Sequence, residues 1–174
     1  MKIFFDTEFT GLHKNTTLIS IGFVTEGGCT FYAELYDYDK NQVDSWVREN
    51  VLENLTLKLG VIYGDARKDS DFKILGDRLI VKHWLEVWLN RFDAIEMWSD
   101  CLAYDWILFC DLFDGVLPGN VFYIPFDIAT LMKVNGIDPD INREEFSGTL
   151  GNKHNALHDA RVIKACYERL KTNV

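Results

Sequence analysis

Two acidic residues, Asp6 and Glu8, stand two positions apart in the segment DTEFTG. The apolar run before them, KIFF, predicts a buried strand, and side chains two positions apart on a strand point to the same side. Two neighbouring carboxylates repel each other unless a cation lies between them, and hard divalent cations prefer oxygen ligands. The pair therefore indicates a divalent metal site, and the alternative is two solvated acids on a surface turn.

A third acid, Asp105, stands in the otherwise apolar segment AYDWILF. Burying an unpaired carboxylate is costly, so this residue needs a partner or a role. It could also be a first-turn acid of a helix predicted over 104–113, where the helix dipole favours negative charge. Both interpretations can hold together, and Asp100 and Asp111 are its rivals in this part of the chain.

The segment HNALHDARV holds a histidine and a fourth acid, His154 and Asp159. Asp159 falls in the first turn of the predicted last helix, which favours a negative charge. On a continuous helix, a spacing of five would place the two side chains well apart around the axis. We therefore expect His154 on the loop before the helix, over a site that Asp159 helps to build. The alternative is a surface histidine beside a capping acid, and His158 is a competing histidine.

The elements that must position these residues alternate along the second half of the chain. Asp44 predicts the cap of a short helix through Val51, and the segments 52–68 and 138–147 are expected to be loops. Strand-type runs followed by alternating helices and strands predict an α/β layered domain with a mixed sheet. The predicted strands cover 2–6, 18–25, 29–36, 94–98 and 120–125, and the predicted helices cover 71–90, 104–113, 126–134 and the region from about 155.

Length and composition limit the classes of protein. A chain of 174 residues favours a single domain over 1–174. The net charge of −9 excludes a broadly basic nucleic-acid coat or a polybasic membrane anchor, so a polyanion must meet a local basic patch or a bound metal. No CxxC pair, secretory signal or apolar run of about 20 residues is present. We therefore expect free thiols, no membrane and a cytoplasmic location.

In combination and order, the three motifs resemble those of the DEDDh 3′–5′ exonucleases, the DnaQ-like or RNase T-like superfamily of the ribonuclease-H-like fold. Asp6 and Glu8 match the first motif, Asp105 the second, and His154 with Asp159 the third. The DTEF signature, LISIG (18–22) and SWVRENVL (45–52) are similar to a bacterial exoribonuclease branch. One departure is that Asp100 and Cys101 occupy the stretch where the family often has His-Asn.

The resemblance implies a mixed five-stranded sheet flanked by helices and one exonuclease domain over 1–174. It implies that two Mg²⁺ or Mn²⁺ ions are held by four acids and that His154 is the general base, a role that suits an imidazole near neutral pH. Single-stranded 3′ ends, with RNA favoured, would yield nucleoside 5′-monophosphates, and a homodimer is compatible with the aromatic content. The implied metal ligands are Asp6, Glu8, Asp105 and Asp159, and the implied substrate contacts are Thr7, Phe9 and Thr10.

Other functions remain open on sequence alone: a DNA-directed exonuclease, a short-oligonucleotide hydrolase, or a non-catalytic nucleic-acid-binding module. Two calcium-loop mimics, DYDKN (37–41) and DPDIN (138–142), fail because their sixth positions are not glycine and their twelfth are not glutamate. Three cations near the third motif are candidates for steering phosphate: Arg143, Lys153 and Arg161.

Overall fold

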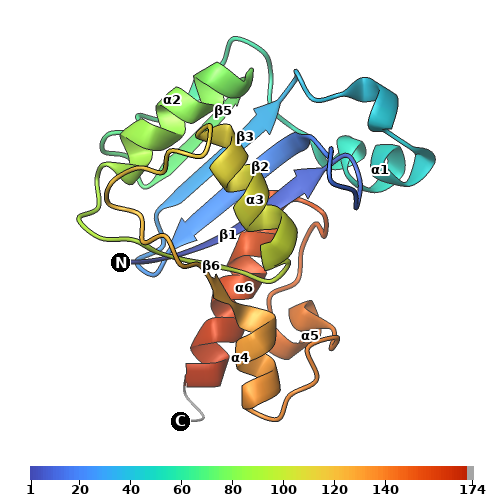
Figure 1. Cartoon of the computed structure of the whole chain (residues 1–174), viewed down its shortest axis with the longest axis vertical. Coiled ribbons are helices and arrows are strands. Elements are labelled where there is room, and N and C mark those ends of the chain that lie inside the picture. Colours follow the sequence, from blue (N-terminus) through green and yellow to red (C-terminus); the bar gives the residue numbers. More distant parts are fainter. Residues whose placement is uncertain (172–174) are drawn as a thin grey trace.

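The computed structural model describes residues 1–171, and its centre is a seven-stranded mixed sheet in the order β4-β5-β3-β2-β1-β6-β7 (Figure 1). The first three strands form an antiparallel meander. Parallel pairs join β3 to β5, β1 to β6 and β6 to β7, and β4 pairs antiparallel with β5. The strands are β1 (Lys2–Phe9), β2 (Leu18–Thr25), β3 (Thr30–Leu35), β4 (Ile62–Tyr63), β5 (Asp71–Gly76), β6 (Glu96–Ser99) and β7 (Phe126–Asp127).

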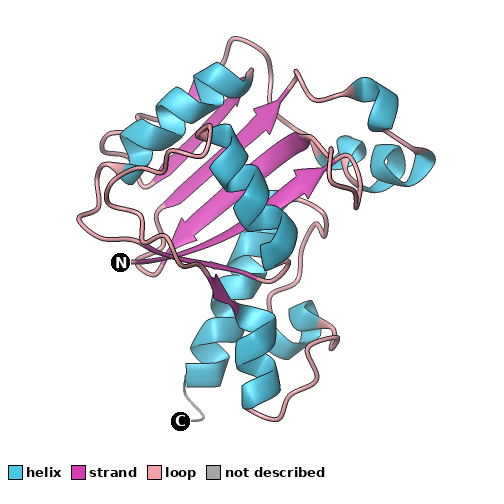
Figure 2. Cartoon of the chain, in the orientation of Figure 1, coloured by secondary structure: helices cyan, strands magenta, loops and turns pink. Residues whose placement is uncertain are grey.

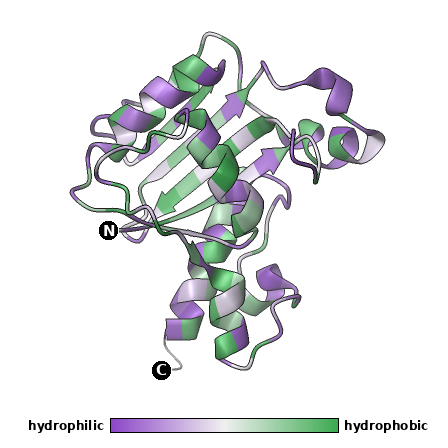
Figure 3. Ribbon diagram, viewed as in Figure 1, coloured by the Kyte–Doolittle hydropathy of each residue, from purple (hydrophilic) through white to green (hydrophobic). Residues whose placement is uncertain are grey.

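Helices cover both faces of this sheet (Figure 2). One hydrophobic core joins α2 and α3 to the side of β1 that carries Phe5, and another joins α4 and α6 to the side that carries Phe4. Figure 3 shows hydrophobic residues along the strands. The helices are α1 (Ser45–Asn50), α2 (Arg78–Leu89), α3 (Leu102–Leu112), α4 (Ile128–Val134), α5 (Arg143–Ser147) and α6 (Ala156–Lys171), with short 3-10 turns η1 (Lys40–Gln42) and η2 (Leu52–Asn54). Among residues 1–171, no helix has the length and apolar character needed to cross a bilayer.

The predicted α/β class with a mixed sheet is confirmed, but the sheet has seven strands rather than five. The helix predicted over 71–90 was wrong in its first part, because β5 occupies Asp71–Gly76 and Asp77 then caps α2 by accepting from the backbone of Ile80. Burial along β5 alternates, which is the period of a half-buried strand. In the sequence, the same alternation of polar and apolar residues at the start of DFKILG was the signal for a strand that the prediction missed.

Other boundaries also differ from the prediction. The strand predicted over 2–6 extends to Phe9, and the segment 52–68, expected to be a loop, contains η2 and β4. The strand expected over 120–125 is reduced to one bridge between Ile95 and Val121, and β7 follows it at Phe126–Asp127. The segment 138–147, expected to be a loop, contains the short helix α5. Asn142 caps that helix by accepting from the backbone of Glu145, so a polar segment forms a helix through its cap.

Gly22 on β2 sets how closely α6 approaches the sheet. It lies between Asp6 on β1 and Tyr32 on β3 in the strand register. A Cβ atom at this position would lie 2.3 Å from the backbone nitrogen of Leu157 and 2.4 Å from the carbonyl of Ala156. The first turn of α6 therefore rests directly on the β2 backbone, and this contact brings Asp159 beside the β1 carboxylates.

We expect Gly22→Ala to lower the free energy of unfolding by about 2 kcal/mol or more, because the added methyl group meets backbone rather than a flexible side chain. Urea denaturation of the purified variant measures this loss. Gly119→Ala is the matched control, since a Cβ there meets nothing within 4 Å. A Gly22→Ala protein as stable as the control would mean that α6 does not need this close approach.

Candidate active site

A cleft of about 820 Å³ opens at the carboxyl end of β1. Its walls come from β1, the turn after β6, α1, the segment that leads into α5, and the loop before α6. The cleft is rich in acids, and the carboxylates that line it are Asp6, Glu8, Asp44, Asp100, Asp140, Glu144 and Asp159. Two of the three predicted motifs therefore open into one cavity.

Asp105, the residue of the remaining motif, is fully buried directly behind this lining. One of its carboxylate oxygens accepts hydrogen bonds from the Thr7 hydroxyl (2.6 Å) and backbone (3.2 Å), and the other accepts from the backbone of Cys101 (3.3 Å). Pairing between β1 and β6 ends at Phe4 and Trp98, so the strands no longer bond each other where Asp105 approaches β1 from α3. Oxygens of Asp6, Asp100 and Asp105 all lie within 4.8 Å of one another.

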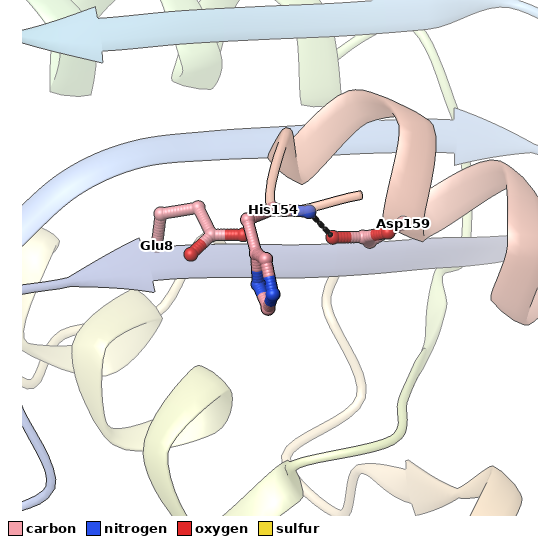
Figure 4. Close-up of side chains that lie close together, drawn as sticks. All are labelled: Glu8, His154 and Asp159. Carbon is pink, nitrogen blue, oxygen red and sulfur yellow. Dashed lines mark hydrogen bonds between the residues drawn. The ribbon is translucent and has the colours of Figure 1, made fainter. Parts of the chain in front are cut away.

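Glu8, His154 and Asp159 form a second group with the same spacing, because their ligand atoms also lie within 4.8 Å of one another. Figure 4 shows Glu8 on the strand, His154 on the loop and Asp159 on the first turn of the helix. The backbone nitrogen of His154 donates to an Asp159 carboxylate oxygen at 2.9 Å, which leaves the imidazole free of that contact (Figure 4). His154 thus lies on the loop before α6, as predicted.

The backbone of His154 is left-handed, with φ of 62°, which is uncommon for a residue other than glycine. Its ring meets the edge of Trp46 on α1, with ring centroids 5.0 Å apart. Partial burial, and to a smaller extent the charge of Lys153, lowers the pKa of His154 below its ordinary value. The imidazole is therefore neutral near pH 7 and able to accept a proton.

The clustered acids are held in an environment that disfavours their charge. Burial, followed by the charges of Asp105 and Glu8, raises the pKa of Asp6 well above its usual range. Burial is also the main cause of a pKa of about 8 for Glu8, about 7 for Asp105 and about 6 for Asp159. Positive charge inside the cleft would reverse these shifts.

The donor set fits divalent metal ions. The Oδ2 atom of Asp6 is buried and has no hydrogen-bond partner within the described chain. A buried acceptor without a partner is costly, so this atom is expected to face a ligand. The groups around it supply carboxylate oxygens, which suit Mg²⁺ or Mn²⁺ rather than a thiophilic metal. Asp6, Glu8, Asp105 and Asp159 could hold such ions.

The structure adds Asp100 to the site, a residue that the sequence suggested only as a rival to Asp105. Asp100 lines the cleft, groups with Asp6 and Asp105, and pairs with Arg143 of α5 at 3.3 Å. The segment WSD at the end of a predicted strand carried this signal, since carboxyl ends of parallel strands meet at one edge of a sheet. Trp46 on α1 is a second lining residue that the sequence did not single out.

The three predicted substrate contacts lie in different surroundings. Phe9 lines the cleft and stacks on Tyr104 with ring centroids 5.1 Å apart. Thr7 also lines it, but its hydroxyl is committed to Asp105. Thr10 is buried, and its hydroxyl donates to Gln42 at 2.5 Å. Direct substrate contact by these residues stays a prediction, with Phe9 the one whose side chain faces the cavity without a polar partner.

The raised pKa values predict how stability depends on pH without metal. Because Asp159, Asp105 and Glu8 titrate at about 6, 7 and 8 when folded, the folded state binds more protons than the unfolded state between about pH 4 and 8. Stability in EDTA should therefore fall as pH rises through that window. The melting temperature in EDTA, measured at pH 5.5 and 8.0, should therefore be lower at pH 8.0. A melting temperature that rises with pH would contradict this prediction.

Asp6→Asn should separate repulsion from metal binding. Without metal, the neutral amide removes a buried charge that other carboxylates repel, so the melting temperature in EDTA at pH 8 should rise. With millimolar Mn²⁺, the wild type should gain stability by mass action and the variant should gain much less. The exposed Asp93→Asn is the control and should keep the full Mn²⁺ response. Equal Mn²⁺ responses in wild type and Asp6→Asn would exclude Asp6 as a ligand.

Comparison with known proteins places the chain among its relatives. No family model matches the chain. It is 32% identical over 163 residues to the 3′–5′ exoribonucleases of two strains of Mycobacterium tuberculosis, and the alignment covers 92% of this chain and 88% of each relative. Among solved structures, the Pan2 catalytic unit of Neurospora crassa (protease and nuclease domain) is similar, with a TM-score of 0.49 and 14% identity. That match covers 98% of this chain and 27% of the Pan2 chain.

The two exoribonucleases align with nearly the whole chain. The resemblance to 3′–5′ exonucleases that the motifs indicated is thereby confirmed. With 32% identity across almost the full length of both partners, the chain belongs to the family of these 3′–5′ exoribonucleases.

Proposed function

We propose that this protein is a metal-dependent 3′–5′ exonuclease that removes nucleoside 5′-monophosphates from single-stranded RNA ends. The observation that carries the proposal is the convergence of four predicted carboxylates and His154 at one cleft. RNA is favoured over DNA because the relatives at 32% identity are named exoribonucleases. An idle binding module would gain nothing from carboxylates that repel one another.

The acids would hold two Mg²⁺ or Mn²⁺ ions, which when bound neutralise charge on the phosphate and make water a better nucleophile. An imidazole nitrogen of His154 accepts the proton from the attacking water, because burial keeps the ring neutral near pH 7. The Asp159 carboxylate holds the backbone of that histidine. Thr7 holds Asp105 in turn through the 2.6 Å bond from its hydroxyl.

The rest of the cleft suits the terminal nucleotide. Phe9 and Trp46 offer aromatic surface, and a base stacked on an aromatic ring is stabilised by about 1–3 kcal/mol. Arg143 and Lys153 also line the cleft and could meet phosphate oxygens. Arg161 is exposed on α6 and does not line the cavity, so we assign it no contact.

We further propose Mg²⁺ as the working ion and a cytoplasmic location. We also propose a single exonuclease domain over residues 1–174, of which residues 172–174 lie outside the described part of the chain. The carboxylate oxygens of the four proposed ligands, Asp6, Glu8, Asp105 and Asp159, support Mg²⁺ or Mn²⁺. The four free cysteines, none of which forms a CxxC pair, support the location. A homodimer is proposed from the aromatic content alone.

Trimming of a 5′-labelled single-stranded RNA tests the function. With Mg²⁺ or Mn²⁺, we expect a ladder of products that shorten from the 3′ end and release nucleoside 5′-monophosphates, whereas EDTA should stop the reaction. Matched DNA and a series of RNA lengths run alongside. Faster cleavage of DNA, or cleavage of dinucleotides only, would replace RNA trimming by one of the alternative activities.

Substitutions assign that activity to the cleft. Asp159→Asn should abolish trimming through loss of a ligand, and His154→Ala should lower kcat about 10²- to 10⁴-fold through loss of the base. Asp93→Asn changes an exposed residue that does not line the cleft, and it should retain wild-type activity. Undiminished trimming by Asp159→Asn would show that the activity belongs to a contaminant or another site.

A further inference from the structure

The loop that carries His154 is in a conformation that needs support. A non-glycine residue at φ of 62° is less stable than in an ordinary conformation and persists only when its surroundings hold it. Asp159 holds one side by accepting from the His154 backbone. On the other side, the carbonyl of Lys153 accepts from the Asn54 side chain at 3.0 Å. Asn155, which follows His154 in the sequence, makes further contacts with α6 and with the sheet.

Asn155 uses both ends of its side-chain amide. Its oxygen accepts from the backbone of His158 at 3.2 Å, which caps the first turn of α6. Its nitrogen donates to the Tyr32 hydroxyl on β3, also at 3.2 Å. The residue that follows His154 therefore joins the helix that carries Asp159 to the centre of the sheet.

The Tyr32 hydroxyl has one hydrogen, which it donates in a hydrogen bond to Glu34. The bond from Tyr32 to a Glu34 carboxylate oxygen is 3.0 Å, and both side chains are almost fully buried, each 2% exposed. Glu34 also accepts from the backbones of Thr56 (2.7 Å) and Leu57 (3.1 Å). Since Tyr32 must donate to this acceptor-only carboxylate, its lone pair is left for the Asn155 amide. The bonds therefore run in one direction, from Asn155 through Tyr32 to Glu34.

This buried polar chain lies outside the cleft, since neither Tyr32 nor Glu34 lines it. Strand register places Tyr32 beside Gly22, the point where α6 rests on the sheet. A phenylalanine would fill the same apolar space without needing a partner. A chain of buried hydrogen bonds instead favours one orientation of the groups that it joins.

We propose that Tyr32 and Asn155 are positioning residues for His154, which hold the loop so that the imidazole lies over the carboxylate cluster. The inference rests on the proposed function in that His154 is taken as the general base. It is independent of the metal, because no residue of this chain of hydrogen bonds is a proposed ligand.

Tyr32→Phe tests the proposal, because it removes the hydroxyl and keeps the ring. We expect kcat for RNA trimming to fall about tenfold, since small misplacement of a catalytic group is enough for such a loss, while KM stays within about twofold. In a His154→Ala background the same substitution should have no further effect. Tyr36→Phe is the matched control, because it removes a phenol–carboxylate bond to Asp77 just beyond the same strand.

Amide exchange gives a readout that does not need activity. In metal-free protein, Tyr32→Phe should speed exchange of the His154 backbone N–H at least tenfold and leave the N–H of Val47, which Asp44 holds in α1, unchanged. If Tyr32→Phe fails to fold, Asn155→Ser replaces it, since serine keeps a capping oxygen and lacks the amide donor.

Three results would overturn the inference: an unchanged kcat in Tyr32→Phe, an equal loss in the wild-type and His154→Ala backgrounds, or His154 exchange that does not respond. If the wild-type protein cleaves no nucleic acid, the proposed function fails on its own. The exchange experiment still decides whether Tyr32 holds the His154 loop, so the two failures are distinguishable.

Discussion

Repulsion among buried carboxylates is the constraint on which the rest of this structure depends. Asp6, Glu8 and Asp105 are each less than a tenth exposed, and each has a raised pKa for which burial is the first cause. A fold under selection for stability alone would not gather such groups, because each charge is costly to bury and each weakens its neighbours. Their coexistence makes sense when cations complete the site, as the unpartnered Asp6 oxygen indicates. It also lets a protein of net charge −9 handle a polyanion, because the attraction is local.

The fold meets this constraint by bringing together elements that are distant in sequence. β1 and β6 pair in parallel only as far as Phe4 and Trp98, and beyond that point acids from the turn after β6 and from α3 approach Asp6. From the other face, α6 lies against β2 at a position that only glycine allows. The site therefore lies where two packing interfaces meet, and small shifts at either interface would separate the carboxylates.

The sequence predicted the chemistry better than the architecture. Each motif alone was also open to a structural role. Their combination and order along the chain resembled the exonuclease motifs, and the relatives support the same family. The strand β5 was missed because its residues precede a strongly periodic helix, and only the cap at Asp77 separates the two. The sequence did not show whether Asp100 or Asp105 belongs to the site, since both are single acids near the end of the same strand. Tyr32, Asn155 and Glu34 could not be joined from sequence, because strand register and helix docking decide which buried polar groups meet.

The two kinds of buried polar group in this protein act in opposite ways. At the cleft, the Oδ2 atom of Asp6 is buried without a partner among residues 1–171 and is available to a ligand. Glu34, by contrast, accepts hydrogen bonds from three different residues. Tyr32 of the Glu34 cluster lies next to Gly22 on one side, and Asp6 of the cleft lies next to it on the other. The first turn of α6 therefore spans both groups. Such a support suits the loop that carries His154, because its left-handed backbone, with φ of 62°, persists only when the surroundings hold it.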